Sequence, residues 1–108
     1  MIKDWKEKFK VVPVNVKQDV LDLLTHKVDV IWLHDHRYFI FDHQTQKNFV
    51  YSDSNYPEGD DTLYQTPFTY KYVSKNLEKI QSGRAEVIFG EILDCFPNFM
   101  NYVKEHGL

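Results

Sequence analysis

The chain has 108 residues, of which 43% are hydrophobic and 16% aromatic, so it can bury one sizeable core and is not expected to be disordered. Its 13 Lys and Arg residues against 16 Asp and Glu residues leave a formal charge of −3, without a basic run that could follow a phosphate backbone. The single cysteine, Cys95, excludes an intramolecular disulfide, and the sequence contains neither a signal-peptide pattern nor a membrane-spanning apolar stretch. We therefore expect a soluble cytoplasmic protein that binds neither nucleic acid nor membrane.

The first long helix is predicted over residues 15–26. Asn15 precedes Gln18 by three residues, which is typical of a capping box, where each side chain bonds to the other's free backbone N–H. Apolar side chains then recur at helical spacing: Val16, Val20, Leu23 and Leu24. The segment KDWKEKF ahead of this helix is expected to form a helical turn that stops before Pro13, because a residue that precedes proline avoids the α region.

The middle of the chain is rich in β-branched and aromatic residues. Residues 28–34, 37–43 and 48–53 predict three short strands of an antiparallel meander, with turns near Asp35 and across QTQK. Alternation in the second strand places Tyr38 and Ile40 on one face and two phenylalanines, Phe39 and Phe41, on the other. Because both faces are apolar, this strand is expected to be central and covered by helices on at least one face.

Residues 52–66 gather Ser, Asp, Asn, Pro and Gly, which predicts a long acidic loop. Thr66 followed by Pro67 then indicates an N-cap with proline in the first helical position, where its missing N–H costs nothing. Apolar side chains continue at helical spacing, and Gly83 is expected to end the helix: Tyr70, Val73, Leu77 and Ile80.

The last quarter of the chain allows two interpretations. Residues 85–89, AEVIF, suit either a helix that continues to Phe96 and breaks before Pro97, or a further strand. Residues 99–106 predict a final helix that ends at Gly107. The fold class that follows is one α+β domain over residues 1–108, in which a three-stranded, or four-stranded, antiparallel meander packs against three to four helices.

Histidines gather in LHDHRYFIFDH, which raises the question of a metal site. On a strand, His34 and His36 would project from one face roughly 6.5 Å apart, and His43 or Asp42 from the neighbouring strand could be a third ligand. The alternative is that residues 35 and 36 form the hairpin turn and direct the two imidazoles apart. In the loop, Gly59 does not sit where a calcium-binding loop requires it, so the expectation is that no metal is bound.

The lone cysteine raises the question of nucleophilic catalysis, which needs an imidazole held by a carboxylate. His36 opens a strand, Asp53 and Ser54 close the following hairpin, and Cys95 lies in LDCF further along the chain. This order and spacing resembles the SUMO-deconjugating cysteine peptidases, with their histidine strand, "DS" strand end and "DCG" helix start. The resemblance implies His36 as base, Asp53 as the residue that orients it and Cys95 as nucleophile.

The chain departs from that family at several positions. Arg37 stands where the family has Trp, Phe96 follows the cysteine in place of Gly, and Phe89 lies where a glutamine of the oxyanion hole is expected. The alternative interpretation is that Cys95 packs as a small buried hydrophobe. Motifs for dinucleotides, nucleotides, serine hydrolases and common zinc enzymes are missing, so we expect no cofactor and favour a protein that acts by binding.

A binding surface is predicted in the acidic loop, because interfaces favour aromatic residues at their centre and charges at their rim. The residues assigned to it are Asp53, Tyr56, Glu58, Asp60, Asp61 and Tyr64. An acidic surface attracts a basic partner and raises the association rate. Small, acidic, cysteine-poor α+β chains of this kind look like bacterial toxin-immunity proteins and phage-encoded inhibitors, which implies another protein, basic in charge, as the partner. The oligomeric state is left open.

Overall fold

The structure is a computed structural model that describes residues 5–33, 37–53, 59–80 and 86–106. The elements follow one another as α1 (Trp5–Lys8), β1 (Val12–Pro13), α2 (Lys17–Thr25), β2 (Lys27–Leu33), β3 (Arg37–Asp42), β4 (Lys47–Ser52), β5 (Thr62–Gln65), α3 (Tyr70–Lys75), α4 (Leu77–Ile80), β6 (Val87–Glu91), α5 (Ile92–Cys95) and α6 (Phe99–Glu105). The whole is one α+β domain with a Cα radius of gyration of 12.8 Å, the size expected of a compact chain of this length.

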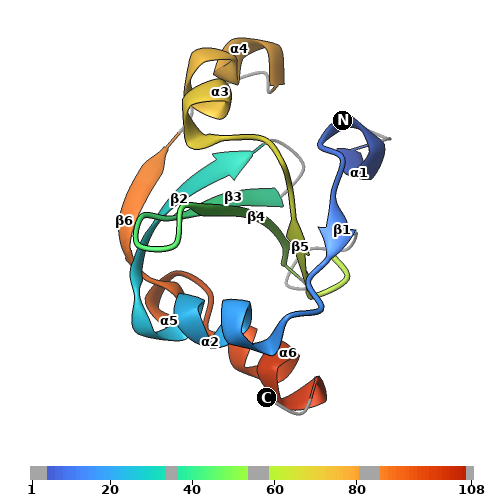
Figure 1. The fold of residues 1–108 in the computed structure, drawn as a ribbon, viewed down its shortest axis with the longest axis vertical. Coiled ribbons are helices and arrows are strands. Elements are labelled where there is room, and N and C mark those ends of the chain that lie inside the picture. The colour runs from blue at the N-terminus through green and yellow to red at the C-terminus, as the bar shows by residue number, and fades with distance from the viewer. Residues whose placement is uncertain (1–4, 34–36, 54–58, 81–85, 107–108) are drawn as a thin grey trace.

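The strands form one antiparallel sheet in the order β1-β5-β4-β3-β2-β6. Figure 1 shows the sheet as a curved layer, with β6 at one end and β1 at the other. β2, β3 and β4 are central because their side chains are large and apolar on both faces. The β3–β4 turn is closed by Asp42, whose carboxylate accepts hydrogen bonds from the N–H groups of Gln44 and Thr45.

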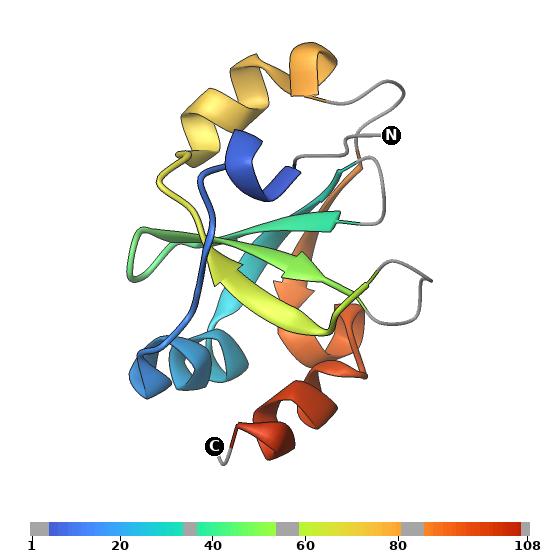
Figure 2. The ribbon, with the colours of Figure 1, turned by 90° about the vertical axis from the view of Figure 1, so that its right-hand side faces the viewer.

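One face of the sheet packs against α2, α5 and α6, as Figure 2 shows. Ile40 of β3 and Phe49 of β4 are buried there against the helices. The apolar residues that the helical segments contribute are Val20, Leu23, Ile92, Phe96, Phe99, Tyr102 and Val103. Burial of these side chains holds the C-terminal helices, which are each too short to be stable in isolation.

The opposite face packs against α1, α3 and α4 (Figure 2). Phe39 and Phe41 of β3 point into this second cluster, whereas Tyr38 and Ile40 belong to the first. The predicted alternation in this strand is therefore confirmed. The remaining buried members of the second cluster are Trp5, Phe9, Ile31, Leu33, Val50, Tyr64, Val73 and Ile80.

The predicted three- or four-stranded meander is wrong, because the sheet has six strands. The three expected strands are present as β2, β3 and β4, but β1 and β5 add to one side and β6 to the other. β5 lies inside residues 52–66, which were expected to be loop throughout. Of the two interpretations of residues 85–89, the strand is right where the structure describes them: Val87, Ile88 and Phe89 pair with β2.

Two predicted helix starts are also wrong. α2 begins at Lys17 after Val16, without a side-chain cap, so Asn15 and Gln18 form no capping box. α3 begins at Tyr70, and its N-cap is Thr69, whose hydroxyl accepts from the N–H of Tyr72. Thr66 instead donates a hydrogen bond to the carbonyl of Phe9 and so ties β5 to the N-terminal segment. α2 thus begins without a local side-chain cap, whereas α3 begins at a local cap three residues later than predicted.

The expected helical turn is present as α1, the break before Pro97 separates α5 from α6, and α6 ends at Glu105, one residue before His106. The expected stops at Gly83 and Gly107 lie outside the described residues. Within the described ranges, the helices all fall short of the length and apolarity that crossing a membrane requires.

Candidate functional site

An acidic surface lies where the segment before β5 meets α6. It consists of three carboxylate residues, Asp60, Asp61 and Glu105, which line a pocket of about 470 Å³ together with Gly59, Asn101 and Lys104. The loop supplies the first two carboxylates and the last turn of α6 supplies the third. The pocket lining mixes polar and apolar surface, and Lys104 offsets one of the three negative charges.

Buried hydroxyl groups hold the loop carboxylates of this surface. Tyr51 of β4 is fully buried, and its hydroxyl donates a hydrogen bond to Asp61. Tyr64 of β5 is 6% exposed and donates to Asp60, which also pairs with Lys6 of α1 at 3.4 Å. Sheet and helix together therefore fix where the two carboxylates lie.

The like charges of the acidic surface act on each other. Burial raises the pKa of Asp61, and the charges of Glu105, Asp53 and Asp60 raise it further, against the hydrogen bond from Tyr51, which lowers it. Burial also opposes ionisation of Asp60, but hydrogen bonding to the side chains of Tyr64 and Ser52, with the nearby Lys6, outweighs it and leaves the pKa of Asp60 below its ordinary value. The surface thus keeps an excess of negative charge, although Lys6 and Lys104 offset part of it.

The six residues predicted for the binding surface have different positions. Asp60 is exposed and Asp61 partly so, and both line the acidic pocket. Asp53 is only 5% exposed and Tyr64 6%, so neither offers much area to a partner. Tyr56 and Glu58 lie outside the described residues.

Sequence reasoning missed three charged residues that join the loop from distant helices: Lys6, Lys104 and Glu105. Glu105 lies 44 positions after Asp61, and Lys6 lies 54 positions before Asp60. Their type is ordinary for a helix surface, so no local signal could have assigned them to this site.

The structure describes two members of the predicted His–Asp–Cys arrangement. Cys95 lies at the end of α5 beside an apolar pocket of about 420 Å³, whose lining includes Trp32, Tyr38 and Phe96. Burial, and then the negative charge of Asp94, raise the pKa of the Cys95 thiol. A nucleophilic cysteine needs the opposite shift, because the thiolate is the reactive form. His36 lies outside the described residues.

Of the three histidines weighed as metal ligands, the structure describes one. His34 and His36 lie outside the described residues. His43 contacts Asp29 at 2.9 Å and meets the ring of Phe41 edge to face, so a carboxylate of the adjacent strand already engages its ring. Among the residues that the structure describes, no three His, Cys, Asp or Glu side chains are grouped so that they could hold a metal ion.

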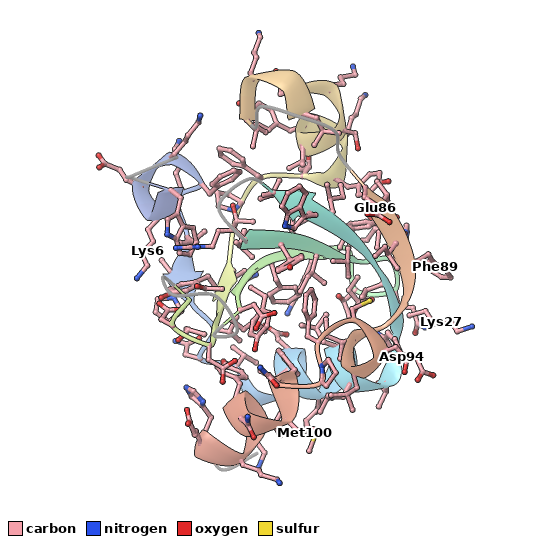
Figure 3. All side chains as sticks on the ribbon, turned by 180° about the vertical axis from the view of Figure 1, so that it is seen from behind. Lys6, Lys27, Glu86, Phe89, Asp94 and Met100 are labelled. Atoms are coloured by element: carbon pink, nitrogen blue, oxygen red, sulfur yellow. The ribbon has the colours of Figure 1, made fainter. Side chains whose placement is uncertain are left out.

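A second candidate surface is the outer edge of the sheet at β6. Three consecutive apolar side chains are exposed there: Val87 by 49%, Ile88 by 47% and Phe89 by 60%. Ile88 also lines the apolar pocket beside Cys95. Figure 3 shows Phe89 pointing outward from this edge, with Glu86 and Lys27 beside it. Clusters of exposed apolar residues commonly mark interaction sites.

Comparisons with known proteins do not add to this geometry. No family model matches the chain, and neither the curated proteins nor the solved structures contain a significant match to it.

Proposed function

We propose that this chain is a small protein-binding module that attracts a basic partner protein through its acidic surface, in the manner of toxin-immunity proteins and phage-encoded inhibitors. One observation carries the proposal: the buried hydroxyls of Tyr51 and Tyr64 hold Asp61 and Asp60 at the rim of the acidic pocket. Carboxylates that are already held in place lose less conformational freedom when a partner binds.

The charge of the surface supports the same function. Negative charges that gather at one place speed the encounter with an oppositely charged partner, and the effect weakens as salt increases. The pocket between Asp60, Asp61 and Glu105 has room for a Lys or Arg side chain of the partner. An Arg could form a bidentate pair with one carboxylate there, which adds geometric specificity.

Glu105 is the residue to change in a test, because Asp60 and Asp61 also hold the loop. Glu105 is exposed on the last turn of α6, so Glu105→Lys should leave the melting temperature nearly unchanged. Glu7→Lys is the matched control: it makes the same change in net charge on an exposed residue of α1, in the opposite helical layer.

The experiment is affinity capture from the source cells with wild type and both variants, followed by stopped-flow measurement of association with the captured protein. We expect one stoichiometric basic protein that wild type and Glu7→Lys retain. With Glu105→Lys, association at low salt should be about tenfold slower. The proposal fails if no stoichiometric partner is captured, or if Glu105→Lys and Glu7→Lys associate at the same rate as wild type.

A further inference from the structure

The backbone of β6 leaves hydrogen-bonding groups facing outward at the end of the sheet. The N–H of Trp32 donates to the carbonyl of Glu86 at 3.2 Å, so this pair is a hydrogen-bonded pair of the antiparallel ladder. In such a ladder bonded pairs alternate, which directs the groups of Ile88 and Gly90 toward β2. The N–H and C=O groups of Val87, Phe89 and Glu91 therefore point away from the sheet. Among the described strands, β6 is the terminal one on this side.

Both faces of this open edge are apolar. On one face, Ile88 borders the pocket of about 420 Å³ that Trp32 and Cys95 also line. On the other face, Phe89 lies with its ring centroid 6.0 Å from that of His43. A strand that is added to a sheet alternates its side chains between the two faces, so each of these surfaces would receive a side chain.

The charges around the edge are mainly acidic. Glu86 and Glu91 flank the apolar residues of β6, and Asp94 follows on α5, whereas Lys27 is the basic residue paired with Glu91. Figure 3 shows Glu86, Phe89, Lys27 and Asp94 along this side of the molecule. An incoming strand with basic residues at its ends would be complementary to this rim.

A second copy of the chain fits the rim less well. Consider two β6 strands paired antiparallel with Ile88 or Phe89 at the centre. In either register, Glu86 of one copy lies opposite a neighbour of Glu91 in the other copy. Like charges at both ends of the pair, together with a formal charge of −3 on each chain, oppose such self-pairing.

We propose that the open edge of β6 binds an extended segment of a basic partner protein as an additional strand, with one large apolar side chain of the segment in the pocket beside Ile88. This rests on the protein-binding function proposed above, but it concerns a different surface from Glu105 and can be tested without the captured partner.

The probe is a synthetic peptide of eight residues that alternates Val or Leu with Thr and carries Lys at both ends. Its matched control has Glu in place of each Lys. We expect the basic peptide to bind at least tenfold more tightly than its acidic counterpart. In ¹⁵N-labelled protein, amide exchange should slow at Val87, Phe89 and Glu91, whose N–H groups face outward. Ile88 and Gly90, already bonded to β2, should change little.

A pair of substitutions separates the contribution of the Phe89 backbone N–H to peptide binding from that of its side chain. Phe89→Pro removes an outward N–H without removing a bond to β2, and edge strands tolerate proline at such positions. Phe89→Ala removes the ring and keeps the N–H. We expect Phe89→Pro to bind the peptide at least fivefold more weakly than Phe89→Ala. Val87→Pro and Val87→Ala are the second pair if Phe89→Pro does not fold.

Several outcomes would overturn the proposal. Equal binding by the proline and alanine variants, or binding without slower exchange at the three outward amides, would place the peptide elsewhere. Equal affinity for both peptides, or no binding of either, would remove the basic segment as the occupant. A dimer in sedimentation that Phe89→Pro dissociates would identify a second copy instead. Glu105→Lys should bind the peptide as wild type does, so this test and that of the acidic surface fail independently.

Discussion

The two terminal strands of the sheet, β1 and β6, differ in length and in the side chains that they expose. At the β1 end, the terminal strand has only two residues and includes Pro13, which carries no N–H. α1 packs nearby, where the rings of Trp5 and Tyr64 meet edge to face with centroids 5.3 Å apart. At the other end, β6 has five residues and exposes three consecutive apolar side chains.

An exposed apolar edge invites pairing with other chains, and proteins commonly cover, shorten or charge such edges. This chain shortens one end and places a proline there, whereas at the other, within the described residues, Glu86 and Glu91 bound a five-residue strand with exposed apolar side chains. The contrast favours a partner strand at β6 and structural roles for β1 and β5.

The largest expected effect is a loss of stability when Trp5 is truncated near the β1 end of the sheet. Trp5 is 6% exposed and lies under the guanidinium of buried Arg37, 4.6 Å from the ring centroid. Trp5→Ala should lower the free energy of unfolding by about 3 kcal/mol, because it leaves a cavity beside Tyr64 and Arg37. Phe89→Ala at the open end should cost less than about 0.5 kcal/mol, since this side chain is largely in water already. Urea denaturation measures both.

Similar destabilisation by the two alanine substitutions would contradict this contrast. It would mean that Phe89 contributes to the core despite its exposure. An unchanged slope of the unfolding free energy against urea is the control that the variants unfold in the same way.

A smaller effect is expected from acid at the protected end. The pKa of Asp60 lies below its ordinary value of 3.8, because hydrogen bonding to Tyr64 and Ser52 and the charge of Lys6 outweigh the opposing effect of burial. Ionised Asp60 thus stabilises the folded state above that ordinary value, and the contribution is lost as the pH falls through the folded pKa. Protection of β5 amides from exchange should decrease between about pH 5 and pH 2 more than protection of the β2–β6 pairs, with most of the loss below the ordinary pKa of 3.8.

Asp60→Asn is the control for this pH dependence. It should reduce the loss of protection in β5 because it removes the titrating group. Asp61 has the opposite effect on stability. Its pKa is raised because burial and the neighbouring carboxylates disfavour the ionised form, so protonation of Asp61 at low pH stabilises the folded state. The same loss of β5 protection in Asp60→Asn as in wild type would rule out Asp60 as the cause.

The smallest expected effect is a gain in stability from a substitution in β6. A Cβ added to Gly90 would meet no atom within 4 Å, and the backbone there is not in the left-handed region. Gly90→Ala should therefore raise the unfolding free energy by about 0.5 kcal/mol, because glycine loses more chain entropy on folding. Thermal unfolding at several protein concentrations measures the gain; a loss of stability would show that this position needs the freedom of glycine.

The centre of the sheet could be predicted from local patterns, whereas its ends could not. β2, β3 and β4 combine β-branched and aromatic residues with turn residues between them, and these signals depend on neighbours in the sequence. β1 has two residues and β5 four, and their pairing joins Val12 to Gln65 across more than fifty positions. Strands this short gain their stability from the partner strand, so their own residues carry little signal.

The candidate site was predictable to a similar degree. The acidic loop was recognised, and Asp60 and Asp61 are at the acidic pocket. The role of Tyr64 was not recognised. This tyrosine was expected to face a partner, whereas its ring is buried and its hydroxyl donates a hydrogen bond to Asp60. A tyrosine offers both an apolar ring and a polar hydroxyl, and only its neighbours decide which of the two faces water.

The sequence by itself determined that the chain is an α+β domain with a two-faced apolar centre, a single thiol and an acidic loop, because composition and short-range periodicity are properties of neighbouring residues. The tertiary structure decided how many strands the sheet has, which carboxylates lie together and which edge remains open. These outcomes depend on contacts between residues tens of positions apart, and burial in such contacts outweighs the local preferences of short segments.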